Sequence, residues 1–143
     1  MAEGLRLLFD IDVLLDILTD RKPFASDSRQ VLSLVERGAA IGFVAAHSIT
    51  TLHYLLSREL SARRTRRALM DLMRLLSVVP VDHDRLLQGF ALGWRDLEDA
   101  VQAACAAKAE VDYLVTRDRK GFAGADIPVA SPAELLVIGS AGP

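Results

Sequence analysis

The chain has 143 residues, of which 51% are hydrophobic, and this size suits one folded domain with a substantial core. Aromatic residues make up only 6%, so the core must consist mainly of Leu, Val, Ile and Ala. The formal net charge of −2 favours no class of partner, and no apolar run reaches the roughly 18 residues that span a bilayer. A single cysteine, Cys105, excludes an intramolecular disulfide bond and fits a reducing compartment. We therefore expect a cytoplasmic protein with no membrane partner, folded over residues 1–138 and followed by a short tail at 139–143.

Short apolar runs of strand length alternate along the chain with stretches in which apolar residues recur at helical spacing. Residues 5–9 form the first such run and Asp10 ends it, after which residues 11–18 have the periodicity of a helix. In chain order, the other expected elements are a helix that is capped by Ser26 or Asp27 and closes near Gly38, a strand at 41–45, helices at 48–59 and 62–76, a strand at 77–81, helices at 84–92 and 97–108, strands at 113–116 and 127–130, and a short last helix that begins at Ser131-Pro132.

This alternation is typical of an α/β fold, here a three-layer α/β/α sandwich with a central, mostly parallel sheet of five strands. In such sheets, ligands bind beyond the carboxyl ends of the strands. Asp10 directly follows the first expected strand, and Asp118 follows the fourth by two residues. We therefore expect these two carboxylates to meet in one crevice.

Motifs of several common enzyme classes are absent from the sequence. It has no phosphate-binding loop, no dinucleotide-binding glycine motif after the first strand and no nucleophile elbow. One cysteine cannot form a thiolate metal site, and Cys105 lies in an Ala-rich helix, where we expect a core residue. The carboxylates remain, and these hard oxygen ligands suit Mg²⁺ or Mn²⁺, ions that bind phosphate oxygens and promote hydrolysis of phosphodiester bonds.

Most of the acids also have an ordinary structural interpretation. Asp96 could be an N-cap, Asp99 could interact with the dipole of a first helical turn, and Asp16 could be a solvated helix residue. Asp10 is harder to explain in this way, because an acid that directly ends a buried strand usually has a specific role there. Several carboxylates in one crevice would also repel one another unless a cation neutralised them.

Six short motifs follow one another along nearly the whole chain. They are the strand end and helix start at residues 9–16, Arg-Lys-Pro-Phe at 21–24, the acidic helix start at 96–102, Val-Thr-Arg-Asp at 115–118 with Phe122 after it, Ile-Pro-Val at 127–129 and Ser-Pro-Ala-Glu at 131–134. In this order and spacing they resemble the motifs of the PIN-domain family. The resemblance is to bacterial VapC-type toxin ribonucleases, in a subgroup whose acidic helix starts with Asp-Leu-Glu-Asp.

The resemblance implies RNA cleavage that depends on Mg²⁺ or Mn²⁺, often by the toxin of a toxin–antitoxin pair. It also implies RNA and an antitoxin protein as partners, and a homodimer as the assembly. Matched to the family's motifs, Asp10 and Asp99 would be the two central metal ligands. Asp118 would be a supporting acid of the catalytic site, and Thr116 the hydroxyl residue that helps to position it. Asp96 would be an auxiliary metal-binding acid, one helical turn before Asp99.

One position departs from the family pattern. PIN domains usually carry a Glu on the helix after the second strand, and residues 48–54 contain no acid. His53 most nearly takes that position, where it could bind Mn²⁺ directly, contact a phosphate or simply pack beside its neighbour. Asp12 and Glu98 are further acids that could supply the missing charge. We therefore expect a metal-dependent endoribonuclease, and the alternative is a PIN-like module that binds RNA or a protein partner without cutting.

A basic stretch lies in the middle of the chain, where residues 58–74 contain six arginines against two acids. Four of these arginines lie within two helical turns and could contact RNA phosphates whatever the base sequence; they are Arg63, Arg64, Arg66 and Arg67. The alternative is a solvated helix face, at a surface that meets a second copy of the chain or an antitoxin.

Overall fold

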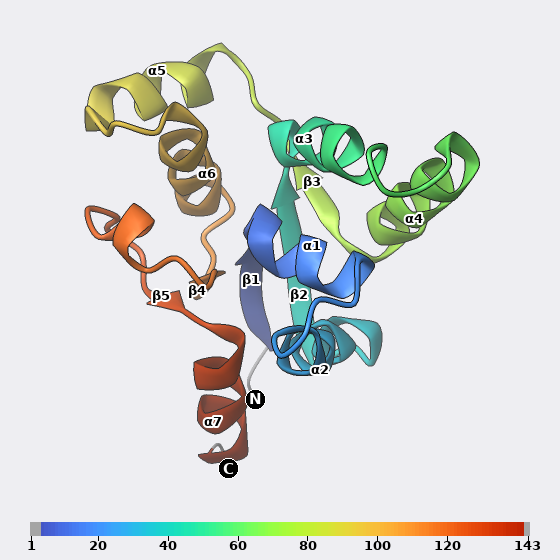
Figure 1. Ribbon diagram of the computed structural model, residues 1–143. Coiled ribbons are helices and arrows are strands. Elements are labelled where there is room, and N and C mark those ends of the chain that lie inside the picture. The colour runs from blue at the N-terminus through green and yellow to red at the C-terminus, as the bar shows by residue number, and fades with distance from the viewer. Residues whose placement is uncertain (1–3, 142–143) are drawn as a thin grey trace.

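A parallel sheet of five strands forms the centre of the computed structural model, which describes residues 4–141 (Figure 1). The strands lie in the order β3-β2-β1-β4-β5, and every neighbouring pair is parallel. They are β1 (Leu5–Phe9), β2 (Ala40–Ala45), β3 (Ser77–Val79), β4 (Tyr113–Val115) and β5 (Val129–Ala130). Residues 1–3, at the start of the expected domain, and residues 142–143, at the end of the expected tail, lie outside the described residues.

Helices connect the strands and follow the last of them. They are α1 (Ile11–Leu18), α2 (Ala25–Glu36), α3 (Ala46–Leu56), α4 (Ala62–Leu75), α5 (His83–Leu92), α6 (Leu97–Lys108) and α7 (Pro132–Ala141), and a 3-10 turn, η1 (Lys120–Phe122), follows β4. Within the described part of the chain, no helix is long and apolar enough to cross a membrane.

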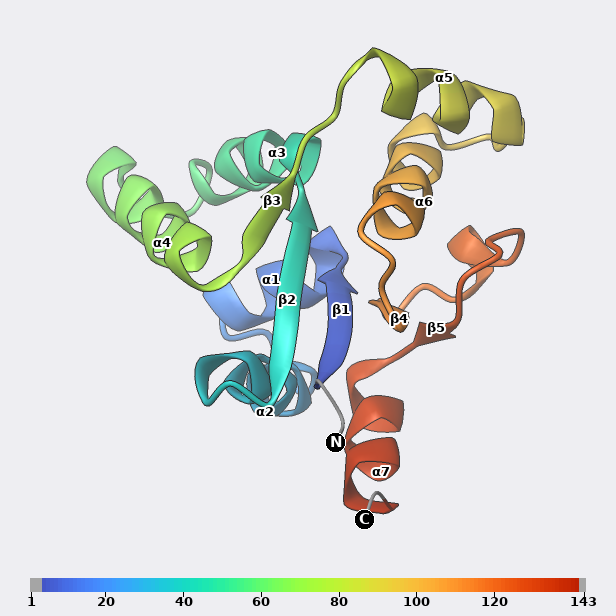
Figure 2. The same ribbon diagram turned by 180° about the vertical axis from the view of Figure 1, so that it is seen from behind.

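Strand β1 lies in the middle of the sheet and contributes to a hydrophobic core on each face. Leu7 and Phe9 pack with buried residues of α1, α2, α3, α4 and α7, whereas Leu8 packs with buried residues of α6. Successive strand side chains point to opposite faces, so these two cores lie on opposite sides of the sheet. Figures 1 and 2 show α1 to α4 on one side and α5 and α6 on the other. The structure therefore confirms the α/β/α sandwich, with a sheet that is parallel throughout.

The elements that place the acids have the bounds expected from the sequence. Strand β1 and helices α1 and α6 agree residue for residue. Asp96 is the N-cap of α6, because its Oδ1 accepts a hydrogen bond from the backbone N–H of Asp99 at 3.1 Å. At the start of α7, the N–H of Glu134 donates to Ser131 Oγ at 3.1 Å and the N–H of Ser131 donates to Glu134 Oε1 at 2.8 Å. This reciprocal pair is a capping box, and it explains why the last helix begins where the sequence predicts.

The expected cap of α2 is wrong. The helix begins at Ala25, before both Ser26 and Asp27, and Phe24 precedes it without a side-chain hydrogen bond. The backbone N–H of Ala25 already donates to the carbonyl of Arg21 at 2.8 Å. A helical turn therefore leads into α2, and no polar side chain is needed to start it.

Several other bounds differ from the expected ones, mostly by one or two residues. Helix α3 ends at Leu56 instead of residue 59, because the chain turns there and the N–H of Leu60 donates to the carbonyl of Leu56 at 2.8 Å. Strand β5 has two residues, since only these two pair with β4. Helix α7 continues to Ala141, beyond the expected domain limit at residue 138.

Candidate active site

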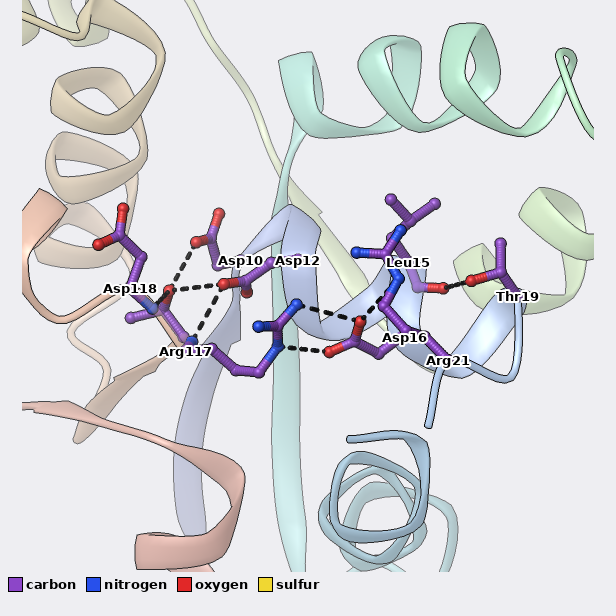
Figure 3. A network of polar contacts seen from close by, with 9 residues as sticks. Asp10, Asp12, Leu15, Asp16, Thr19, Arg21, Arg117 and Asp118 are labelled. Carbon is purple, nitrogen blue, oxygen red and sulfur yellow. Dashed lines mark hydrogen bonds and ion pairs between the residues drawn. The ribbon is translucent and has the colours of Figure 1, made fainter. Parts of the chain in front are cut away.

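The acids after the first and fourth strands meet at the carboxyl edge of the sheet. Asp10 directly follows β1, and residues 116–118 directly follow β4, the neighbouring strand. The backbone N–H of Asp10 donates to the carbonyl of Val115 at 2.9 Å, so the two segments leave the sheet side by side. Figure 3 shows Asp10, Asp12 and Asp118 close together at this edge.

Asp10 is held by donors on both of its carboxylate oxygens, and its residue is only 7% exposed. Its Oδ1 accepts from the backbone N–H of Ile11 and from Nε2 of Gln102, each at 2.7 Å, and its Oδ2 accepts from Oγ1 of Thr116 at 2.7 Å. The contact with Ile11 also makes Asp10 the N-cap of α1. These hydrogen bonds fix the orientation of the carboxylate; Oδ1 already accepts two of them, whereas Oδ2 keeps a lone pair for a further ligand.

Gln102 was not among the residues expected at the site. It lies in α6, is 1% exposed, and its Oε1 has no hydrogen-bond partner. A signal existed in the sequence, because Gln102 is the one strongly polar residue in the stretch 100–106, all of which is buried. A buried amide in an apolar stretch usually has a specific polar partner, and here that partner is Asp10.

Thr116 connects Asp10 with Asp118. Its side chain is fully buried, its hydroxyl donates to Asp10, and its Oγ1 accepts from the backbone N–H of Asp118 at 3.0 Å. Oδ1 of Asp118 in turn accepts from the backbone N–H of Gly121 at 3.1 Å. Thr116 therefore holds the carboxylate of Asp10 and the backbone of Asp118 at the same time.

Asp99, at the start of α6, faces Asp118 across a space that Gly121 leaves open. A Cβ placed on Gly121 would lie 2.6 Å from Oδ2 of Asp118 and 3.1 Å from Oδ2 of Asp99. The pKa of Asp99 is raised to about 7, chiefly by burial and then, in decreasing order, by the negative charges of Asp96, Asp10, Asp118 and Glu98. The two central acids and their expected supports thus form one electrostatic group.

Asp12 belongs to the same group. Burial raises its pKa to about 6, and the charge of Asp10 acts in the same direction, against the opposing effect of Arg117. Its Oδ2 accepts from the backbone N–H of Arg117 at 3.1 Å, and its Oδ1 is buried without a hydrogen-bond partner (Figure 3). Asp12 therefore adds negative charge close to Asp10, as the sequence allowed.

Asp16 is fully buried, so its interpretation as a solvated helix residue is wrong. The guanidinium of Arg117 covers it, with Nε at 2.6 Å from Oδ2 and Nη2 at 3.2 Å from Oδ1, and Nε of Arg21 lies 3.7 Å away (Figure 3). Arg117 also lies over the ring of Phe24, 3.8 Å from its centroid. The ion pair between α1 and the segment after β4 anchors that segment, which carries Thr116 and Asp118.

The structure does not bring His53 to the acids. Its side chain is exposed, and its ring makes no hydrogen bond or ion pair with any described residue. Thr51 of α3 contacts α6 instead, because its hydroxyl donates to Oε2 of Glu98 at 3.0 Å. Ring nitrogen Nε2 of His47 lies 3.0 Å from the carbonyl oxygen of Glu98. A carboxylate therefore does lie against α3, but it comes from Glu98 on another helix, one of the two sources that the sequence offered.

All of the basic stretch except its first residues lies on α4, beside the edge strand β3. A cavity of about 610 Å³ follows this helix, and its lining includes Arg63, Arg66, Arg67 and Arg74. Arg64 is also exposed but does not line that cavity. Of the five, only Arg74 makes an ion pair among the described residues, with Asp71 at 3.2 Å.

The donors at the sheet edge are of the kind that Mg²⁺ and Mn²⁺ prefer. Asp10, Asp99 and Asp118 offer carboxylate oxygens, and the last two have oxygens facing one space beside Gly121. Within the described residues, no three His, Cys, Asp or Glu side chains converge closely enough to form a ready-made metal cluster. In donor chemistry the site fits a hard divalent cation. After burial, repulsion by neighbouring carboxylates raises the pKa of Asp99, and such a cation would relieve that repulsion.

Comparison with known structures finds a similar fold in bacterial toxin–antitoxin proteins. The chain aligns with VapBC2 from Rickettsia felis at a TM-score of 0.71 and 12% identity, covering 89% of this chain and 98% of the other. A toxin–antitoxin complex from Klebsiella pneumoniae gives 0.68 and 24% identity, with 88% and 97% covered. VapC20 from Mycobacterium tuberculosis, described as a toxin that cleaves the sarcin–ricin loop, gives 0.67 and 15%, with 82% and 93% covered.

A comparison with curated protein sequences gave no significant match. The sequence model of the PIN domain, in contrast, matches residues 6–120. The matched region runs from β1 to the start of η1 and contains every acid of the candidate active site, and the solved structures independently give the same fold. The chain therefore belongs to the PIN-domain family.

Proposed function

We propose that this chain is an endoribonuclease that uses Mg²⁺ or Mn²⁺ to hydrolyse RNA phosphodiester bonds. The observation that carries the proposal is that Asp10, Asp99 and Asp118 lie at the same carboxyl edge of the sheet, where burial first and then the negative charges of neighbouring acids raise the pKa of Asp99. Carboxylates held this close to one another are costly unless a cation binds them, so the arrangement favours a metal-dependent reaction over a purely structural role.

The residues have distinct tasks in this proposal. Asp10, Asp99 and Asp118 would hold the cation, with Asp96 adding charge from the start of α6. When bound, the ion would supply Lewis acidity to the phosphate group of the RNA. Asp10 would need no reorientation, because Gln102 and Thr116 already hold its carboxylate from both sides.

We further propose that the protein acts in the cytoplasm as the toxin of a toxin–antitoxin pair, and that it forms a homodimer. Support comes from the solved structures of similar fold, several of which are complexes of toxins with antitoxins. Apolar side chains on α5 offer a surface for one of these partners, since Leu87 is 54% and Phe90 is 65% exposed. The arginines of α4, Arg63, Arg64, Arg66 and Arg67, are proposed as a general contact for RNA phosphates.

A second candidate is a PIN domain that binds RNA or a protein without cutting. The observation that favours it is on α3, where the family usually carries a Glu and this chain has an exposed His53 that makes no contact with the acids. Glu98 lies against α3 but is exposed, and it is hydrogen-bonded to Thr51. This second candidate predicts RNA binding with no cleavage under any metal.

One experiment separates the two candidates. Purified protein is incubated with structured RNA and either Mg²⁺ or Mn²⁺, beside the variant Asp10→Asn. The proposed function predicts cleavage that needs the metal and is abolished by the substitution. If the protein cuts no RNA with either ion, or if Asp10→Asn cuts as well as the wild type, the proposed function is wrong.

A further inference from the structure

A cavity of about 310 Å³ is lined by Asp99 and, in part, by residues to which no role has been given so far. Its volume is at the lower end of the range for small-ligand sites, roughly 300–1,000 Å³. Trp94 and Arg95, from the loop before α6, form part of the lining together with Lys120 of η1. Because Asp99 lines the same cavity, whatever binds in it lies next to the candidate active site.

The cavity contains two cations that are free to bind an anion. Arg95 and Lys120 are exposed, and neither makes a side-chain hydrogen bond or ion pair with any described residue. The other cations near the acids are engaged, since Arg117 is paired with Asp16 and Arg119 with Glu134. An RNA strand that approaches Asp99 meets strong negative charge, so unpaired cations beside the acids are the groups that would attract its phosphates.

The cavity also contains the chain's single tryptophan. Trp94 is half-buried, and its ring meets the ring of Phe122 edge-on, at 77° and with the centroids 6.0 Å apart. Gly124 lines the same cavity, and a Cβ placed there would lie 3.0 Å from Nε1 of Trp94. A glycine at this position therefore leaves room beside the indole that a larger residue would fill.

We propose that this cavity is a nucleotide subsite that holds one nucleotide of single-stranded RNA, with its base against Trp94 and its phosphate near Arg95 and Lys120. Proteins that bind single strands combine aromatic side chains, on which bases stack, with cations that contact the backbone. The subsite would place the strand so that the adjacent phosphodiester bond reaches Asp99. The role of the subsite in cleavage rests on the proposed function, but its binding of RNA can be measured without cleavage.

Trp94 provides a direct signal for this binding. The metal-free protein, in the presence of a chelator, is titrated with a short single-stranded RNA while the tryptophan fluorescence is recorded. Binding of the same RNA, labelled at one end, is followed separately by fluorescence anisotropy. We expect the tryptophan signal to change and to saturate with the same midpoint as the anisotropy. If the anisotropy reports binding while the tryptophan signal stays constant, or if no RNA binds, the subsite does not exist.

Variants test the separate contributions of the ring and the cations. We expect Trp94→Leu to weaken RNA binding roughly tenfold and Trp94→Phe to retain most of the affinity, because a stacking surface remains. In a plot of log affinity against log salt concentration, the double variant Arg95→Gln/Lys120→Gln should have a slope that is less steep by about 1.4. This corresponds to about 0.7 for each lost cation. These cations are exposed, so the substitutions leave the core intact.

Arg37→Gln is the matched control. Arg37 is an exposed cation at the C-cap of α2, before β2 and therefore at the opposite edge of the sheet. Its substitution should leave the affinity and the salt dependence unchanged. If Arg37→Gln lowers the affinity as much as the loss of Arg95 or Lys120 does, the cavity has no special role.

The subsite and the proposed function can fail independently. If the wild type cuts RNA with Mg²⁺ or Mn²⁺ but none of the Trp94, Arg95 or Lys120 variants alters RNA binding, the subsite is wrong and the ribonuclease remains. If the tryptophan signal and the salt dependence behave as expected but no RNA is cut, the RNA-binding cavity stands and the catalytic proposal is wrong.

Discussion

The side-chain amide of Gln102 in α6 donates a hydrogen bond to Oδ1 of Asp10 at 2.7 Å, and both side chains are buried. We expect Gln102→Leu, which removes this donor but keeps a side chain of similar size, to lower kcat/KM for RNA cleavage roughly 10- to 100-fold. The reason is that Asp10 would lose one of the contacts that orient it. Gln88→Leu, at an exposed position on α5, is the control and should cut normally. Wild-type activity in Gln102→Leu would show that this contact is dispensable.

The buried ion pair between Asp16 and Arg117 should matter for stability. We expect Arg117→Met to lower the free energy of unfolding by about 3 kcal/mol, because it leaves the buried carboxylate of Asp16 with only the longer, 3.7 Å ion pair to Arg21. Denaturant unfolding monitored by circular dichroism measures the effect. The control is Arg29→Met, which removes the exposed ion pair with Asp20 and should cost less than about 1 kcal/mol. Equal costs for the two variants would contradict the proposed anchoring of the segment after β4.

The raised pKa of Asp99 makes the stability of the metal-free protein depend on pH. Its carboxyl group has a pKa of about 7 in the folded state, against 3.8 for the unperturbed group. Between these values the folded state binds more protons than the unfolded state, so the free energy of unfolding falls as pH rises. Asp12, with a pKa of about 6, acts in the same direction. We therefore expect the Tm of the metal-free protein to fall as pH rises from about 5 to about 8.

Thermal unfolding in the presence of a chelator checks this dependence on pH. Asp99→Asn removes the group with the higher pKa, so its Tm should change less over the same interval. Addition of Mg²⁺ or Mn²⁺ at the upper end of the interval should restore Tm in the wild type, because the ion neutralises the repulsion. An Asp99→Asn protein with the same pH slope as the wild type would show that another group controls it.

Gly121 keeps the space between Asp99 and Asp118 open. We expect Gly121→Ala to weaken binding of Mn²⁺ roughly tenfold or more, because the new Cβ would displace both carboxylates. Its effect on Tm should be small, since the atoms displaced are the ends of side chains and φ of Gly121 lies outside the left-handed region. Isothermal titration calorimetry measures the affinity. Unchanged metal binding in Gly121→Ala would exclude this space from the metal site.

The thiol of Cys105 should be inert in the folded protein. Its side chain is fully buried, and burial raises its pKa to about 11, so the reactive thiolate is scarce at neutral pH. We expect a thiol reagent to modify the native protein only as fast as the core opens, and to modify one thiol per chain at once in denaturant. Rapid modification of the native protein would place Cys105 outside the core.

The parts of the site that the sequence predicts are those that depend on the chain's local pattern. Asp10 ends an apolar run of strand length, and this pattern was enough to place it at the end of β1. The position of Asp118 followed from the parallel arrangement of the strands, which brings their carboxyl ends to one edge. Asp96 was identifiable as an N-cap because it precedes a stretch with helical periodicity.

The contacts that the sequence did not predict join elements that are far apart along the chain. Asp16 looked solvated because α1 has a polar side, but Arg117 from the segment after β4 covers it. His53 and Thr51 differ by two residues, which is more than half a helical turn at 3.6 residues per turn. Once Thr51 faces α6, His53 must point elsewhere, and only the packing of α3 against α6 decides which of the two meets Glu98.

Asp10 caps α1 through the backbone N–H of Ile11, and it accepts the hydroxyl of Thr116 as well. A substitution by alanine would therefore remove a helix cap, worth about 1 kcal/mol, together with the proposed metal ligand, and a loss of activity could not be separated from a loss of folded protein. Asparagine keeps an acceptor oxygen for the cap. The hydroxyl of Thr116 also has a second acceptor within reach, Oδ2 of Asp12 at 3.3 Å. Asp10→Asn, unlike Asp10→Ala, can therefore separate a loss of RNA cleavage from a loss of the helix cap.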